Sequence, residues 1–295
     1  MAPQYDLHIG VAGWSYEDWK GVVYPSGQKS KLSFMARYVD CIEVNTSFYR
    51  PLNPGLANKW IGEVSDHDEF RFTAKLYQKF THELDKPYPE SEAVEAVRSG
   101  FAPLYEAGKL LAVLVQFPFY FRDGEQNRNR LKRISEDFGD FPLVLEVRDA
   151  SWAKAETLRF IDSLDMNVAC LDMPLTRNSF REKAIATGPL AYLRLHGRNY
   201  DAWFSKESER DDRYNYLYGD DEMDFTIDRI QRLRDMSDQT VVVWNNHFRG
   251  KAVVNALEAA NRLFGEPVEV PPLLLKSYPR LSKISRGQGG PLFEQ

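Results

Sequence analysis

Eight short apolar runs, separated by segments with helical periodicity, constrain the fold of this chain more than any other feature. Strands are expected at His8–Gly13, Cys41–Asn45, Arg71–Leu76, Leu110–Phe117, Leu143–Arg148, Asn167–Asp172, Leu190–His196 and Thr240–Asn246. Helices are expected at Ser91–Gly108, Asn127–Phe138, Lys154–Leu164, Glu222–Met236 and Gly250–Phe264. This alternation is typical of repeated β-α units. We therefore predict an α/β fold of the (β/α)8 TIM-type barrel class, which leaves no sheet edge exposed.

Two regions depart from the repeat. The connection Met173–Pro189 contains two prolines, so the helix after the sixth strand is expected to be irregular or missing. The C-terminal segment contains five prolines from Pro267 onward. We predict a single barrel domain over residues 1–265, and an extended C-terminal arm over residues 266–295 that packs partly on the barrel. An open doubly wound sheet is the rival fold, but no strand is followed by a Gly-rich dinucleotide fingerprint.

Charge and hydropathy indicate the cellular compartment and disfavour some classes of partner. The chain has 38 basic and 43 acidic residues, a net charge of −5, which favours neither nucleic acid nor anionic membrane as a general partner. No apolar run approaches the ~18 residues of a membrane span, and the N-terminus does not resemble a signal peptide. We expect a cytoplasmic protein without membrane contact. Cys41 and Cys170 lie in apolar runs and are expected to be buried thiols.

Polar side chains gather near the C-terminal ends of the predicted strands. Alternation along the fifth strand places Glu146 and Arg148 on the face opposite its leucines, which points into a barrel. The same parity applied to the other strands assigns further polar residues to the inner face. These are Glu43, Asn45, Lys75, Gln116, Asp172, Arg194, His196 and Asn245. This end of a barrel carries the active site in essentially every characterised enzyme of the fold, so we expect the site there.

The residue types suggest separate roles. Carboxylates and a histidine can transfer protons, so the expected catalytic residues are Glu43, Glu146, Asp172 and His196. Cations, amides and aromatic rings can clamp an anion and orient hydroxyl groups. The expected substrate-binding residues are Trp14, Asn45, Tyr49, Lys75, Gln116, Arg148, Arg194, Asn245 and Asn246.

Eight segments, in order along the chain, resemble the domain-of-unknown-function 72 family, also called YecE-like. They are Ile9–Pro25, Phe34–Arg50, Phe70–His82, Leu110–Phe121, Leu143–Trp152, Ala191–Asn199, Arg213–Met223 and Val241–Ala256. The resemblance implies a TIM-type barrel and brings no accepted reaction. It therefore agrees with the alternation pattern without naming a mechanism.

Two classes of function remain open. The first is an enzyme, such as a hydrolase or lyase, that acts on a phosphorylated or sugar-derived anion at the C-terminal mouth. A variant of it uses Mg or Mn held by the acidic residues and His196, since oxygen-rich sites suit those ions. The second is a non-catalytic protein that binds nucleic acid or a nucleotide. The negative net charge disfavours the second class.

Overall fold

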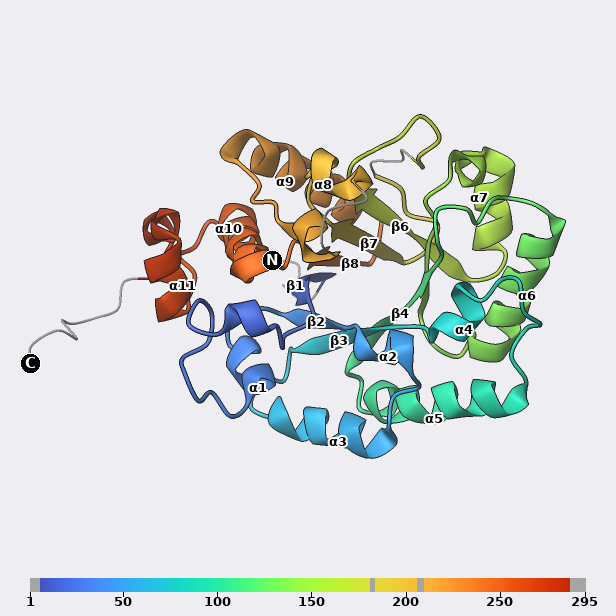
Figure 1. The fold of residues 1–295 in the computed structure, drawn as a ribbon, viewed down its shortest axis with the longest axis horizontal. Coiled ribbons are helices and arrows are strands. Elements are labelled where there is room, and N and C mark those ends of the chain that lie inside the picture. Colours follow the sequence, from blue (N-terminus) through green and yellow to red (C-terminus); the bar gives the residue numbers. More distant parts are fainter. Residues whose placement is uncertain (1–5, 181–183, 206–209, 287–295) are drawn as a thin grey trace, which may run out of the picture.

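Eight parallel strands close into a barrel in the order β1 to β8 (Figure 1). The computed structural model describes residues 6–180, 184–205 and 210–286. The strands are β1 Leu7–Ala12, β2 Cys41–Val44, β3 Arg71–Lys75, β4 Leu110–Gln116, β5 Leu143–Glu146, β6 Met166–Asp172, β7 Leu190–Leu195 and β8 Gln239–Trp244. β1 pairs with both β2 and β8, which closes the ring. The predicted barrel is confirmed, and every strand lies where the alternation placed it.

Helices surround the barrel and fill most of the connections (Figure 1). The α-helices are α1 Lys31–Met35, α2 Thr46–Tyr49, α3 Pro54–Glu63, α4 Gln78–Thr81, α5 Ser91–Glu106, α6 Glu125–Phe138, α7 Ala155–Asp162, α8 Tyr200–Phe204, α9 Asp220–Asp235, α10 Lys251–Phe264 and α11 Pro272–Ser277. The 3-10 helices are η2 Glu17–Trp19, η3 Ala150–Ala153, η4 Arg210–Tyr214, η5 Phe248–Gly250 and η6 Pro279–Lys283. Among the helices of the described ranges, none combines the length and the apolar character of a membrane-spanning segment.

Two apolar layers hold the barrel together. A large outer layer lies between the strands and the helices, and a smaller one fills the barrel interior. Interior members such as Val144, Tyr192 and Val243 alternate with outer members such as Leu145 and Leu193. Polar side chains that share the interior parity therefore continue this column of packed residues toward the C-terminal ends of the strands.

The connection between β6 and β7 contains no helix in its described parts, residues 173–180 and 184–189, as predicted. It is fastened instead to the segment that follows β5. The Phe180 N–H donates to the carbonyl of Arg148 at 2.7 Å, and the Ala150 N–H donates to the carbonyl of Asn178 at 2.9 Å. These bonds fix the backbone of Arg148, whose side chain belongs to the site described below.

The expectation of an extended C-terminal arm is wrong for residues 266–286. This segment carries the short helices α11 and η6, and Leu274 and Leu281 are fully buried within the outer apolar layer. Arg280 Nε also donates to Glu258 of α10 at 2.6 Å. The prolines misled the prediction because Pro272 and Pro279 occupy the first turns of these helices, where proline is tolerated. Residues 287–295 lie outside the described part.

Candidate functional site

Arg194 of β7 lies at the centre of the polar cluster inside the barrel and is completely buried. Its Nε and Nη2 donate to the two carboxylate oxygens of Glu43 on β2, at 2.9 and 2.7 Å. Its Nη1 donates to Oε2 of Glu146 on β5. The planar guanidinium suits this forked contact. One side chain thus joins three strands, and both carboxylates are fully buried.

Glu146 has further partners on its second oxygen. Oε1 accepts hydrogen bonds from Arg148 Nη2 at 2.8 Å and from Gln116 Nε2 at 2.7 Å. Burial alone would raise the pKa of Glu146, but the guanidinium groups of Arg194 and Arg148 hold it well below its usual range. Glu146 is therefore an anion at any pH near neutral, and its charge is already compensated by two arginines.

Lys75 of β3 is the least tightly paired charge of the cluster. Its Nζ lies 3.9 Å from Oε1 of Glu43, an oxygen that Arg194 already contacts at 2.7 Å. The Nζ also lies 5.8 Å from the centre of the Phe48 ring. Burial, followed by repulsion from Arg194, lowers the pKa of Lys75 from 10.5 to about 8. A measurable fraction of this amine is consequently neutral at physiological pH.

Two histidines of the cluster are neutral at pH 7. Burial, and then Arg194, holds the pKa of His196 well below its usual range, and Asn245 Nδ2 lies 2.9 Å from His196 Nδ1. Burial, and then Arg148, lowers the pKa of His82 to about 4. His82 follows α4 and contacts the Phe48 ring edge-on at 4.8 Å. Both rings can accept or donate a hydrogen bond without adding charge.

The described part of the cluster therefore carries one surplus positive charge. Lys75, Arg148 and Arg194 face the two carboxylates of Glu43 and Glu146. The acids are fully buried, whereas the side chains of Lys75 and Arg148 are 14% and 21% exposed. The groups that reach solvent are thus cations, an arrangement suited to binding an anion.

Aromatic rings from loops form a rim beside His196. Trp203 of α8 and Tyr214 of η4 have ring centres 6.0 and 6.4 Å from His196. Tyr214 also lies 4.9 Å from His247, which stacks on Tyr16 at 4.2 Å. The alternation pattern along the strands places none of these four rings, nor His82, in the site. The sequence signal that indicates Trp203 and Tyr214 is the long connection after β7, which is rich in aromatic residues.

Asp172 does not join the cluster, and its predicted inner-face position is wrong. Its neighbours Ala169 and Leu171 belong to the interior layer, so Asp172 shares the outer parity of Cys170. It accepts hydrogen bonds from Arg198 at 2.7 and 2.8 Å and from Tyr218 at 2.9 Å. It lines a separate cavity of about 620 Å³. The prediction fails because the odd-numbered residues of β6 face inward, so the carboxylate that ends the strand points outward.

The remaining predicted contacts divide into two groups. Asn45 follows β2, and its buried Oδ1 has no hydrogen-bond partner among the described residues; Tyr49, four residues on, is 50% exposed. Asn246 is instead fully buried away from the cluster, where its Nδ2 donates to Asn255 of α10 at 2.9 Å. Trp14 packs edge-on against Trp60 of α3 at 5.1 Å. The structure therefore gives Asn246 and Trp14 packing contacts rather than places in the cluster.

The acidic residues do not fit a divalent metal. Arg194 lies between the carboxylates of Glu43 and Glu146 and donates to both, and Asp172 lies elsewhere. Within residues 6–180, 184–205 and 210–286, no group of three or more His, Cys, Asp and Glu side chains gathers as a metal site. The carboxylates are thus committed to arginines and do not form a ligand set for Mg or Mn.

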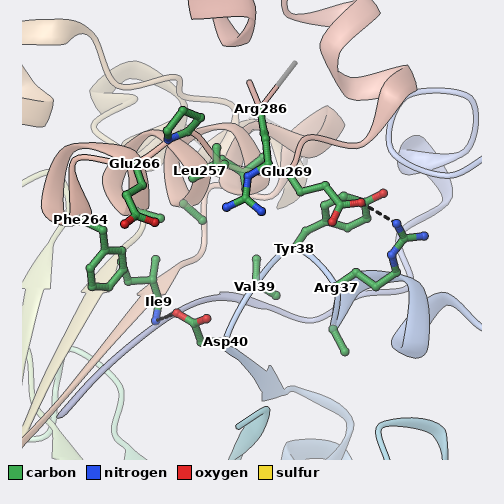
Figure 2. Close-up of a pocket in the computed structure, with 15 residues that line it drawn as sticks. Ile9, Arg37, Tyr38, Val39, Asp40, Leu257, Phe264, Glu266, Glu269 and Arg286 are labelled. Carbon is green, nitrogen blue, oxygen red and sulfur yellow. Dashed lines mark hydrogen bonds and ion pairs between the residues drawn. The ribbon is translucent and has the colours of Figure 1, made fainter. Parts of the chain in front are cut away.

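A cavity of about 320 Å³ at the other end of the barrel is a poorer candidate (Figure 2). It lies beside Ile9 and Asp40, close to the N-terminal ends of β1 and β2. Figure 2 shows Arg37 and Glu269 pointing toward each other, and they form an ion pair. The Asp40 carboxylate accepts from the Ile9 N–H at 3.1 Å. This end of a barrel usually serves stability.

Comparison with known proteins supports one assignment. The model of a family described as "Protein of unknown function DUF72" matches residues 8–278. The chain belongs to the DUF72 family. This agrees with the resemblance seen in the sequence, and the family description carries no reaction.

Relatives of the DUF72 chain match most of its length. UPF0759 protein YunF of Bacillus subtilis is 28% identical over 84% of this chain and 92% of its own. The crystal structure of a DUF72 family protein from Thermotoga maritima is 30% identical, with a TM-score of 0.76 over 88% of this chain and 99% of its own. A DUF72 family protein from Enterococcus faecalis is 25% identical, with a TM-score of 0.76 over 90% and 98%.

Proposed function

We propose that the barrel mouth is the active site of an enzyme that acts on a small anionic substrate, phosphorylated or sugar-derived. One observation carries the proposal. Three cations face two carboxylates, and the solvent-facing members are Lys75 and Arg148. Burying unbalanced charge is costly unless something compensates it. An anionic ligand would supply the missing negative charge.

The cluster assigns a role to each charge under this proposal. Arg148 offers the accessible guanidinium, held in place by Glu146 and by the backbone bond from Phe180. Arg194 is inaccessible and acts as a positioning residue through Glu43 and Glu146. The two carboxylates, which we expected to transfer protons, are paired with cations and favour a positioning role. Lys75, with a pKa of about 8, is better matched to proton transfer near neutral pH.

The rim supports a substrate with a sugar-like body. Trp203 and Tyr214 present partly buried rings beside His196. Aromatic faces pack well against the apolar face of a sugar while hydroxyl groups bond elsewhere. The buried Oδ1 of Asn45, which has no partner within the described ranges, can accept a hydrogen bond from such a hydroxyl.

Calorimetric titration with inorganic phosphate and sulfate tests the anion site. Arg148→Gln should weaken binding by about tenfold or more, because a hydrogen bond to a charged group contributes roughly 1.5–3 kcal/mol. Arg37→Gln is the matched control, since Arg37 is a half-exposed arginine in an ion pair at the other end of the barrel. The affinity of Arg37→Gln for either anion should equal that of the wild type. Failure of both anions to bind, or equal loss in both variants, would contradict the proposal.

A non-catalytic nucleic-acid or nucleotide site is the second candidate, favoured by two exposed rings, Tyr120 beside His82 and Tyr49 beside Phe48. Tyr120 is 64% exposed with its hydroxyl 3.5 Å from the His82 carbonyl, and Tyr49 is 50% exposed. Such rings can stack on bases. Binding of single-stranded DNA with a steep salt dependence, weakened by Tyr120→Ala, would favour this candidate over the enzyme.

A further inference from the structure

We propose that Lys75 is a nucleophile that forms a Schiff base with the carbonyl group of an anionic aldehyde or ketone bound at the barrel mouth. The inference rests on the proposed function and deepens it, because it names the substrate class and the group that attacks it. Three features of Lys75 support it, namely its pairing, its surroundings and its position.

The pairing leaves Lys75 as the surplus cation. Glu43 is engaged by two nitrogens of Arg194 at 2.7 and 2.9 Å, and also accepts from the Tyr192 hydroxyl at 3.1 Å. The Nζ of Lys75 reaches this carboxylate only at 3.9 Å. Glu146 is satisfied by Arg194, Arg148 and Gln116. No described carboxylate therefore makes a close ion pair with Lys75 that would hold the proton on its amine.

The surroundings favour the neutral amine. A lysine next to other cations, or out of water, loses its proton more easily and becomes a nucleophile. Burial and the repulsion from Arg194 and Arg148 outweigh the attraction of Glu43 and Glu146, and the resulting pKa of Lys75 is about 8. The Phe48 ring centre lies 5.8 Å from the Lys75 nitrogen, a cation–π contact that favours the charged amine but is weak at this distance.

The position allows a substrate to arrive. Lys75 is the last residue of β3 and points inward at the C-terminal end of the barrel, with 14% of its side chain exposed. Arg148, which is 21% exposed, lies in the same cluster and could hold a carboxylate or phosphate of the substrate. A substrate held through its anionic group would thus place its carbonyl carbon beside an amine rather than beside a carboxylate.

The chemistry balances without a redox partner. The neutral Nζ adds to the carbonyl carbon, and the C=O π pair moves to the oxygen, which takes a proton while the nitrogen loses one, leaving a neutral carbinolamine. The nitrogen pair then forms the C=N bond as that oxygen, protonated once more, leaves as water. One net proton is consumed, and the product is a protonated imine. Its positive charge remains opposite Glu43, and it can draw electrons from the adjacent carbon of the substrate.

Reductive trapping on the full chain tests the inference. The probes are glyoxylate, a small anionic aldehyde, and glycolaldehyde, which is similar in size and uncharged, each with sodium cyanoborohydride to reduce the imine. Modification is followed by peptide mass spectrometry at Lys75 and, as an internal reference, at Lys59, whose side chain is 68% exposed. At pH 7.5, glyoxylate should modify Lys75 at least about tenfold faster than it modifies Lys59. The rate at Lys75 should rise with a midpoint near pH 8.

The outcomes separate the inference from the proposed function. Inorganic phosphate should slow the modification of Lys75, and Arg148→Gln should abolish the preference for glyoxylate over glycolaldehyde. If phosphate binds calorimetrically but Lys75 reacts no faster than Lys59, the Schiff base is refuted and the anion site stands. If Lys75 reacts equally with both aldehydes and phosphate has no effect, the anionic substrate class is refuted, and the proposed function with it.

Discussion

At the scale of single residues, the site is a set of charges with unequal protection. Arg194, Glu43 and Glu146 are fully buried and bonded to one another, whereas Lys75 and Arg148 reach solvent. Removing a member of a buried ion pair leaves an uncompensated charge, but removing a partly exposed member does not. The same kind of substitution should therefore destabilise the fold to very different extents at two arginines of one cluster.

We predict that Arg194→Gln lowers the free energy of unfolding by roughly 3–5 kcal/mol, because it leaves Glu43 and Glu146 buried without their shared cation. Arg148→Gln should cost about 1 kcal/mol or less, since Glu146 keeps Arg194 and Gln116 as partners. Urea unfolding of both variants measures the difference. Equal losses would mean that Arg148 belongs to the scaffold rather than to a ligand site.

Lys75 should make stability depend on pH in an unusual direction. Its pKa in the folded chain, about 8, lies below its ordinary value of 10.5, so between these pH values the unfolded chain binds more protons. The contribution of Lys75 to stability therefore rises with pH across this window and is a penalty below pH 8. Lys75→Met should raise the melting temperature at pH 7, and the gain should shrink toward pH 10.5. A variant less stable than the wild type at pH 7 would show that Lys75 is a structural partner of Glu43.

At the scale of elements, the hydrophobic pattern of the sequence predicts most strands and helices. It does not predict where two parts of the chain approach each other closely. The interior parity correctly placed Glu43, Lys75, Gln116, Glu146, Arg148, Arg194, His196 and Asn245. It failed at Asp172, because one residue of offset turns a side chain to the other face of a strand. The rings of Trp203 and Tyr214 could not be assigned, since the path of an irregular loop is decided by tertiary contacts.

Two helical glycines illustrate such approaches. A Cβ at Gly100 of α5 would lie 2.3 Å from the carbonyl oxygen of Leu52, whereas a Cβ at Gly62 of α3 would meet nothing within 4 Å. We predict that Gly100→Ala destabilises the fold by about 1–3 kcal/mol through overpacking. Gly62→Ala should stabilise it by roughly 0.5–1 kcal/mol through helix propensity. Chemical denaturation of the pair checks both signs, and a stabilising Gly100→Ala would show that α5 can shift away from Leu52.

At the scale of the whole molecule, the eightfold repeat predicted the barrel because each β-α unit carries its own pattern. The path of residues 266–286 was not predictable in the same way. Two short helices beginning at prolines carry no periodic signal, and only their packing on the barrel stabilises them. This C-terminal segment completes the outer apolar layer, which places Leu274 and Leu281 among the buried residues of the barrel wall.

We predict that Leu274→Ala lowers the free energy of unfolding by roughly 2–5 kcal/mol, the usual cost of emptying a buried leucine site. Leu175→Ala is the matched control, because Leu175 is 40% exposed in the connection after β6. It should change stability by less than about 0.5 kcal/mol. Thermal and urea melts measure both. A near-neutral Leu274→Ala would indicate that the barrel folds without support from the C-terminal segment.

The contacts of Arg194 with Glu43 and Glu146 also limit how such a site could be redesigned. These contacts join β2, β5 and β7 through charges that depend on one another. Replacing Glu43, Glu146 and Arg194 one at a time would therefore give unstable intermediate variants. The rim is free of this constraint, since Trp203 and Tyr214 belong to short helices outside the barrel. A library that varies these rings and keeps Glu43, Glu146 and Arg194 should therefore yield folded proteins with altered ligand preference far more often than the reverse library.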